Sequence, residues 1–476
     1  MKTIKKILSV ALCLVLGSCI AACGGDSSGS EDQIKINKLS SLADYDNAGG
    51  VMDIYAYFPS DDRDGLKAML DAGFNSVLMT RPNTYITTNK AHLKETMDIL
   101  EDLSETYDFK VYPFTGHMLS DTNFDGEFYS YLTDYKCLGG LYIYDEPYPN
   151  TLASIGDASL DFIDSEKYGK DYKFLVTMHP STVTESSKWT WKDVSYEDLI
   201  VDYYDEVVRN FGDKSRVWMS ADIYPIVGGE GGLGKRTLKP SYLYNVGVIA
   251  SYAKKYGLES NIALQALDHI NYPEPTLQDL RLQLNTLLAF GIDTYSVYTF
   301  DTPTLTYPGE ENRQGCYKDG EPTAIYGRMK QLNTEMRAWQ SVYKSFEWQG
   351  IIPCSTENSA NDTAFRLLKS VADDERLLVS TILDNTDTVL VKGFSSTGDS
   401  LLGYFSDKNG NEGFMITNYA ETQSGKSSTA TVTFKGCNKA YVYRNGAKQT
   451  VELKNGVLTI ELAAGDGAFV IPFAQN

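Results

Sequence analysis

The chain has 476 residues, of which 42% are hydrophobic and 22% are charged, and its formal net charge is −20. This length and hydrophobic content are typical of a globular protein with one large domain and a smaller one. Its negative charge would repel phosphates, so nucleic acid is not an expected partner.

Residues 1–23 have the pattern of a targeting segment: three lysines, then an apolar stretch too short to favour a transmembrane helix. The stretch ends on small residues before Cys23 and resembles the lipobox of bacterial lipoproteins, in which the cysteine is lipidated. Cys19 fits the same pattern, but the Gly- and Ser-rich residues 24–48 follow Cys23 directly and predict a flexible tether. Lipidation predicts a protein held by a lipid anchor at the cell surface or periplasmic side, and a cleaved signal peptide is the alternative.

Residues 49–348 alternate between short β-rich runs and longer helical patterns. The eight β-rich runs are VMDIYAYF, NSVLMT, FKVYPFTGH, GGLYIYDEP, KFLVTMHP, RVWMSADIYP, NIALQALDH and DTYSVYTFD. Gly73, Gly257 and Gly291 stand where helices are expected to end. Eight such repeats predict a (β/α)8 barrel. The competing fold, an open doubly wound sheet, would normally place a Gly-rich turn after the first strand, and none stands there.

Residues 351–476 have a different residue pattern, which predicts short alternating strands separated by frequent turns. Asn-Gly pairs at 409–410, 445–446 and 455–456 predict tight hairpins. This segment is therefore expected to form an all-β sandwich without a catalytic constellation.

Reactive side chains of a (β/α)8 barrel gather at the C-terminal ends of its strands. The residues expected there are Tyr57, Arg81, His117, Asp145, Glu146, His179, Asp222, Tyr224, Gln265, Asp268, His269, Tyr298 and Asp301. Tyrosine offers a flat face to a sugar ring and a hydroxyl to its polar edge. For each single residue, a hydrogen-bonded polar cap on the barrel rim is the structural alternative.

Cleavage of a glycosidic bond needs a carboxylic acid and a second carboxylate. Glu146 is the expected acid, because the neighbouring charge of Asp145 would keep it protonated. Consecutive strand residues point in opposite directions, so one of the two could be structural. Asp222 is the first choice for the second catalytic carboxylate, ahead of Asp268 and Asp301.

YIYDEP, residues 142–147, resembles the strand-4 signature of (β/α)8 glycoside hydrolases, which usually reads Asn-Glu-Pro with the glutamate as acid/base. Residues 275–300, 316–336 and 465–473 are similar to segments of β-galactosidase-like barrels and their β-sandwich tail. The resemblance implies a glycosidase that acts on oligo- or polysaccharides without a cofactor. It places Glu146 in the catalytic site. The strand-end positions make Tyr57, Arg81, His117, Asp145, His179, Tyr224, Gln265, Asp268, Tyr298 and Asp301 the candidate substrate contacts.

Two positions depart from that family. Asp145 stands where asparagine is common, and Gln265 stands where the nucleophilic glutamate of strand 7 is expected. Because glutamine cannot attack or take a proton, Asp222 acting on a water molecule, with inversion of configuration, becomes the expected mechanism.

Two other classes of function compete. A non-catalytic surface lipoprotein that binds glycans is favoured by Gln265. A metal-dependent barrel hydrolase would use His117, His179 and His269, but no HxH stands on the first strand and no HExxH motif occurs. No metal is therefore expected.

Overall fold

The computed structural model describes residues 35–37, 45, 50–87, 89–117, 119, 123–182, 194–228, 236–269, 272–303 and 313–475. The segment Ile36–Asn476 forms one compact unit. The predicted targeting segment, with Cys23, and most of the predicted tether lie outside the described residues. Within the described ranges no helix is long and apolar enough to cross a membrane.

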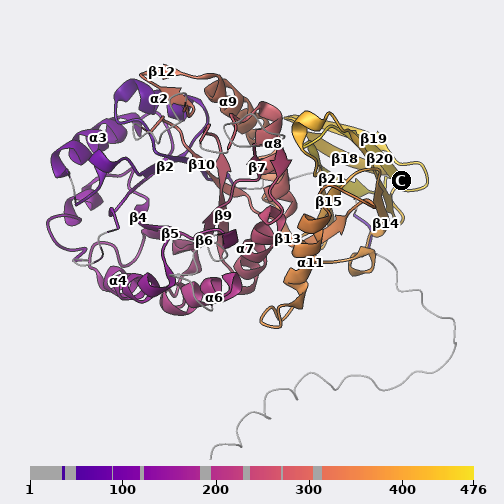
Figure 1. Ribbon diagram of the computed structural model, residues 1–476, viewed down its shortest axis with the longest axis horizontal. Coiled ribbons are helices and arrows are strands. Elements are labelled where there is room, and N and C mark those ends of the chain that lie inside the picture. Colours follow the sequence, from indigo (N-terminus) through magenta and orange to yellow (C-terminus); the bar gives the residue numbers. More distant parts are fainter. Residues whose placement is uncertain are drawn as a thin grey trace, which may run out of the picture. The chain divides into compact units, whose positions relative to one another are not determined.

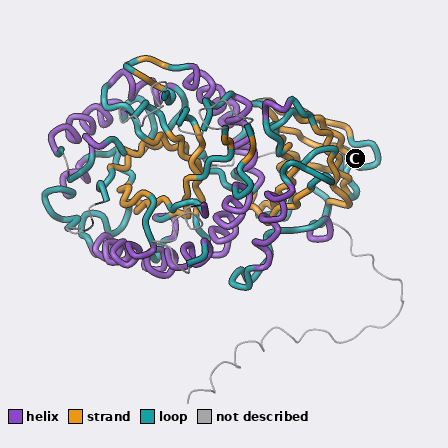
Figure 2. The backbone as a smooth tube through the Cα atoms, viewed as in Figure 1, coloured by secondary structure: helices purple, strands orange, loops and turns teal. Residues whose placement is uncertain are grey.

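Eight parallel strands form the barrel, and each lies within one of the predicted β-rich runs or overlaps it. They are β1 (Ile54–Tyr57), β2 (Ser76–Met79), β3 (Lys110–Pro113), β4 (Gly140–Asp145), β5 (Lys173–Thr177), β6 (Trp218–Asp222), β9 (Glu259–Gln265) and β10 (Thr294–Tyr298). Six of them pair in the order β3-β2-β1-β10-β9-β6, and β4 pairs with β5. Parallel bridges then join β3 to β4 and β5 to β6, which closes the ring seen in Figure 2. The predicted (β/α)8 barrel is confirmed.

Among the described residues, seven α-helices surround this ring (Figure 1). They are α2 (Arg63–Asp71), α3 (Lys90–Leu103), α4 (Leu152–Asp164), α6 (Tyr196–Glu206), α7 (Tyr242–Tyr256), α8 (Leu277–Ala289) and α9 (Ala324–Arg337). α3 buries Leu93, Met97 and Leu100, which the helical repeat places on one face. Between β3 and β4 the described residues form a short 3-10 helix, η3 (Ser130–Asp134), in place of an α-helix.

The residues at the helix ends explain where the helices begin and stop. The side chain of Thr276 accepts the Asp279 N–H at the start of α8, and the Asp279 carboxylate accepts the Thr276 N–H in return. α7 ends at Gly257, whose φ of 67° lies in the left-handed region that glycine adopts without strain.

Aromatic side chains fill the interior of the barrel. The cluster consists of Tyr55, Leu78, Tyr112, Phe114, Tyr142, Leu175 and Trp218. The rings of Tyr55 and Trp218 meet edge to face with centroids 5.1 Å apart. The Trp218 indole N–H donates to the Val176 carbonyl at 2.8 Å, so its polar atom is satisfied within the core. The barrel is therefore packed beneath its C-terminal end.

Two antiparallel sheets follow the barrel. The six-stranded sheet runs in the order β13 (Phe346–Cys354), β15 (Ser400–Asp407), β16 (Glu412–Asn418), β21 (Gly467–Phe473), β18 (Lys439–Arg444) and β19 (Ala447–Glu452). The three-stranded sheet contains β14 (Val391–Ser396), β17 (Ser428–Phe434) and β20 (Val457–Leu462). A second apolar cluster draws side chains from both sheets, Ile416 and Val432 among them, which confirms the sandwich.

Helix α11 (Asp362–Ser370), between β13 and β14, was not expected in this all-β segment. It buries Ala364, Phe365 and Leu368, and a Cβ on Gly247 of α7 would touch the Leu368 side chain. The contact with the barrel stabilises a helix of nine residues, which would be marginal alone. The short elements α10 (Gln340–Tyr343), β7 (Ile226–Val227), β8 (Thr237–Leu238), β11 (Tyr317–Lys318) and β12 (Glu321–Pro322) complete the described regular structure, apart from other 3-10 turns.

Two of the three Asn-Gly pairs form the predicted hairpins. The pair at 409–410 connects β15 to β16, and the pair at 445–446 connects β18 to β19 with φ of 49° and 76°. The pair at 455–456 also forms a tight turn, closed by an antiparallel bridge between Lys454 and Val457. Beyond this bridge the chain leads from β19 in one sheet to β20 in the other, so the turn is present but the two strands that flank it pair elsewhere.

Gly403 of β15 lies where the sandwich packs on the barrel, and an added Cβ would contact the carbonyl group of Ala289 at the end of α8. Gly403→Ala is expected to lower the free energy of unfolding by about 1–3 kcal/mol, since backbone cannot move aside cheaply. Gly393→Ala in β14 is the control, because nothing lies within 4 Å of its added Cβ. Urea unfolding followed by circular dichroism measures both, and equal midpoints would contradict this account of the packing.

Candidate functional site

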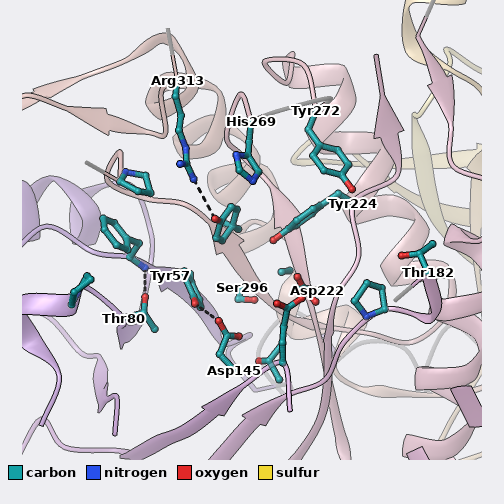
Figure 3. A pocket seen from close by; sticks show the side chains of 18 of the residues that line it. Tyr57, Thr80, Asp145, Thr182, Asp222, Tyr224, His269, Tyr272, Ser296 and Arg313 are labelled. Atoms are coloured by element: carbon teal, nitrogen blue, oxygen red, sulfur yellow. Dashed lines mark hydrogen bonds between the residues drawn. The ribbon is translucent and has the colours of Figure 1, made fainter. Parts of the chain in front are cut away.

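A cavity of about 500 Å³ opens at the C-terminal ends of the barrel strands (Figure 3). Its carboxyl groups belong to Asp145, Glu146 and Asp222. Its other lining residues are Tyr57, Phe58, Thr80, Pro82, Tyr85, Thr177, Pro180, Thr182, Tyr224, Lys239, Ala263, His269, Tyr272, Ser296, Tyr298, Pro303 and Arg313. The volume lies within the range of about 300–1,000 Å³ that is common for ligand sites.

The end of β4 presents two consecutive carboxylates to this cavity. An extended strand would direct Asp145 and Glu146 to opposite sides. Glu146, however, has a φ of 54°, in the left-handed region, and its N–H donates to the Thr177 carbonyl at 2.8 Å. This turn brings both side chains to the cavity, so neither faces away.

Asp145 is held by two phenols. Tyr57 donates to one carboxyl oxygen at 2.5 Å, and Tyr142 donates to the other at 2.6 Å. Burial and the charge of Glu146 raise the pKa of Asp145 to about 6, although the two phenols act in the opposite direction. Because both of its oxygens are engaged, Asp145 is better placed to position a ligand than to attack one.

The carboxyl groups of Glu146 and Asp222 lie near each other, and each shifts the pKa of the other. Asp222 ends β6, and burial raises its pKa well above the usual range, with further increases from the charges of Glu146 and Asp145. Burial would also raise the pKa of Glu146, but the neighbouring imidazole of His179, followed by Asp222, lowers it overall. His179 Nδ1 lies 3.1 Å from Glu146 Oε1.

These opposite shifts favour the proton on Asp222 and the negative charge on Glu146. The sequence argument expected the reverse order, with Glu146 as the protonated acid. The sequence argument counted the neighbouring carboxylate, Asp145, but it could not include the imidazole of His179, which β5 places against Glu146.

Aromatic rings form one wall of the cavity. Tyr224 stacks against Tyr298 with centroids 5.6 Å apart, and Tyr57 lies 5.4 Å from the Tyr298 centroid. Tyr272 meets Tyr224 edge to face at 5.4 Å. Such a wall suits the apolar face of a sugar ring.

The remaining predicted site residues lie outside the cavity lining. Arg81 pairs with Asp301 at 2.6 Å, so these two form an ion pair on the rim. Gln265 is 2% exposed, and its side-chain amide donates to the Pro273 carbonyl at 3.1 Å. The Asp268 N–H donates to the Gln314 carbonyl at 3.3 Å, and the carboxyl group of Asp268 does not line the cavity.

The three histidines of the competing metal-dependent hydrolase do not form a metal site within the described ranges. The His117 ring packs against Tyr144 at 4.5 Å, His179 contacts Glu146, and His269 lies 6.2 Å from the Tyr298 ring. Across the described part of the chain, no group of three His, Cys, Asp or Glu side chains could hold a metal ion.

Several lining residues were not anticipated. Ser296 stands two residues before Tyr298 on β10, so strand alternation alone could have placed it on the same face. Lys239, Tyr272 and Arg313 belong to the segments that follow the strands, where no periodic pattern predicts the direction of a side chain.

No family model matches this chain, and no curated protein matches it. Among solved structures, a GH30 endoxylanase from Clostridium papyrosolvens aligns over 90% of this chain and 98% of its own, at 10% identity and a TM-score of 0.43. α-Galactosidase I from Mortierella vinacea aligns over 90% of this chain and 97% of its own, at 9% identity and a TM-score of 0.46. A GH27 β-L-arabinopyranosidase from Geobacillus stearothermophilus aligns over 91% of this chain and 98% of its own, at 10% identity and a TM-score of 0.45. Similarity this distant leaves the function to be inferred from the chain's own side chains.

Asp145→Asn tests the electrostatics of the site. A carboxyl group whose pKa is about 6 in the folded state and 3.8 otherwise favours the folded state at low pH. Its contribution is lost as pH rises from about 4 to 6, on the order of 2–3 kcal/mol. The free energy of unfolding of the wild type should therefore fall relative to that of Asp145→Asn across this range. Parallel pH profiles from urea unfolding would contradict the raised pKa.

Proposed function

We propose that this protein is a glycoside hydrolase in which Asp222 and Glu146 form the catalytic pair. The observation that carries the proposal is the placing of these two neighbouring carboxyl groups, whose pKa values shift in opposite directions, in one cavity walled by tyrosines. One protonated and one ionised carboxyl group are the two species that glycosidic cleavage requires.

In the proposed mechanism Asp222 donates its proton to the leaving glycosidic oxygen, and the Glu146 carboxylate attacks the anomeric carbon. Asp222, now ionised, then takes a proton from the water that hydrolyses the glycosyl–Glu146 intermediate. His179 keeps Glu146 ionised and fixes its orientation through the 3.1 Å contact. Asp145, held by Tyr57 and Tyr142, positions sugar hydroxyls.

Retention of configuration follows from this mechanism, because Glu146 acts as the nucleophile. Retaining enzymes separate the two carboxyl groups by about 5–5.5 Å, whereas inverting enzymes leave about 6.5–9.5 Å for a water molecule. The effect of Glu146 and Asp222 on each other's pKa supports the shorter separation. The proposal therefore departs from the inverting mechanism, with Asp222 as the base, that the sequence led us to expect.

The location of the protein remains a proposal from its sequence. Lipidation of Cys23 would anchor it at the cell surface or on the periplasmic side, with the barrel, residues 49–348, facing polysaccharide in the surroundings. Residues 351–476 would support the barrel rather than contribute to the chemistry.

A non-catalytic glycan-binding protein is the second candidate. It is favoured by Gln265, which is buried in the position where a strand-7 nucleophile would stand. The two candidates differ in turnover but not in binding, so hydrolysis assays separate them.

Glu146→Gln and Asp222→Asn are each expected to lower kcat by at least about 10³-fold, because the two carboxyl groups act as a unit. Asp301→Asn is the control, since Asp301 pairs with Arg81 and does not line the cavity. Initial rates on a panel of aryl glycosides, with melting temperatures to verify folding, provide the measurement. A Glu146→Gln variant as active as the wild type would contradict the assignment of Glu146 to the catalytic pair.

Proton NMR of the first-formed product gives an independent check. We expect the newly released sugar to have the anomeric configuration of the substrate, since Glu146 forms a covalent intermediate. Release of the opposite anomer would restore the water mechanism and require the two carboxyl groups to separate on binding.

A further inference from the structure

A buried carboxylate outside the cavity joins three separate segments of the chain. Asp279, in the first turn of α8, is 0% exposed. One of its oxygens accepts the N–H and the hydroxyl of Thr276, both at 2.8 Å. The other accepts Arg236 Nη2 at 2.5 Å and the hydroxyl of Thr422. Asp279 therefore connects the segment after β6, the start of α8 and the sandwich to one another.

Arg236 has a second contact with the sandwich. Its Nε lies 3.2 Å from Glu421 Oε1, and its side chain is only 10% exposed. Glu421 and Thr422 stand in the turn between β16 and β17. The guanidinium thus lies between a carboxylate of the barrel and a carboxylate of the sandwich, an arrangement that its planar fork of donors suits. Because these groups are largely buried, loss of one partner leaves the others incompletely compensated.

Arg236 directly precedes a strand that returns to the cavity. This strand, β8, pairs antiparallel with β7. The Lys239 N–H donates to the Pro225 carbonyl at 2.7 Å at the end of the same ladder. Tyr224, one residue before Pro225, and Lys239 both line the cavity. The contacts of Arg236 therefore help to fix the positions of two cavity residues.

The start of α8 reaches the same wall of the cavity through another segment. Thr276 and Asp279 hold the end of the segment that leads from β9 to α8, and Tyr272 of that segment lines the cavity. Lys239 Nζ lies 3.4 Å from the Tyr272 hydroxyl. Figure 3 shows Tyr272 beside Tyr224, and their rings meet edge to face. The two segments that Asp279 joins thus meet again at the tyrosine wall.

We propose that Arg236 is a positioning residue for this wall, and that the sandwich contributes to the site through it. The side chains of Arg236, Asp279, Glu421 and Thr422, here called the Arg236 cluster, hold the two segments that carry the wall. The catalytic carboxyl groups stand at the ends of β4 and β6, which the barrel sheet fixes separately. The cluster therefore acts on sugar binding more than on bond cleavage. For its effect on substrate, this inference rests on the glycosidase function proposed above.

Hydrogen–deuterium exchange of the full chain tests the positioning without any substrate. In the double variant Glu421→Gln/Thr422→Val, peptides that contain β7 and β8 should exchange at least about fivefold faster, because local opening becomes easier. Peptides from β4 and β5 should not change. Thr417→Val is the matched control: the Thr417 hydroxyl donates to the Asn285 carbonyl at 2.9 Å across the same interface, and neither residue lines the cavity.

Kinetics on the aryl glycoside that the wild type hydrolyses fastest separate positioning from support of the fold. The double variant should raise KM by about three- to tenfold and change kcat by less than about twofold, since the wall binds substrate and transition state alike. Arg236→Gln should raise KM further, and Arg236→Lys, which keeps the charge without the planar fork, should lie between it and the wild type. Thr417→Val should leave both constants unchanged. If Arg236→Gln does not fold, the double variant and Arg236→Lys carry the test.

Unchanged exchange of β7 and β8 in both the double variant and Arg236→Lys would overturn the proposal. An equal change in Thr417→Val would also overturn it, because the effect would then be a general loss of stability. A fall in kcat with KM unaltered would contradict the role in binding. Failure of the glycosidase function has a different signature: the wild type hydrolyses no aryl glycoside, while exchange of β7 and β8 still responds to the double variant. That result would keep Arg236 as a positioning residue and remove the enzyme.

Discussion

The interaction among the carboxyl groups of Asp145, Glu146 and Asp222 is the constraint on which the site depends. These three groups share one cavity, and they cannot all be ionised without a large energetic cost. The protein lowers that cost in three ways: the pKa of Asp222 is raised, His179 contacts Glu146, and two phenols hold Asp145. The carboxyl groups of Glu146 and Asp222 therefore differ in pKa, one shifted down and the other up.

At the opposite end of the barrel, where the strands begin, charged side chains form ion pairs. There Lys173 lies 2.9 Å from Glu259 and 3.7 Å from Asp53, so basic and acidic side chains neutralise one another. At the C-terminal end the carboxyl groups that line the cavity contact two phenols and the imidazole of His179, and they raise or lower each other's pKa. Charge that is paired supports the fold, whereas charge left facing a cavity can act on a ligand. The aromatic cluster around Tyr55 and Trp218 separates the two ends and gives the cavity a packed floor.

Much of the architecture follows from sequence pattern because it depends on local periodicity. Eight β-rich runs, helices between them and glycines at helix ends were enough to predict the barrel, and Asn-Gly pairs marked two hairpins. The errors arose where distant segments decide the outcome. α11 is stabilised by packing on α7, and the turn at 455–456 joins strands that pair in different sheets. The site shows the same division: Tyr57, Asp145, Glu146, Asp222, Tyr224 and Tyr298 line the cavity as expected, whereas Arg81, Gln265 and Asp301 do not.

The sequence by itself determined which residues stand at the strand ends, because strand and helix periods count residues along one chain. Only the tertiary structure decided which of them meet and in which direction each pKa shifts. The left-handed turn at Glu146 brings two consecutive carboxylates to one cavity, and β5 and β6 bring His179 and Asp222 to the second of them. Ionisation depends on through-space charge and solvent exclusion, which fall off with distance in three dimensions rather than with separation along the chain. For that reason the sequence could place these residues at the strand ends but could not predict the order of their pKa values.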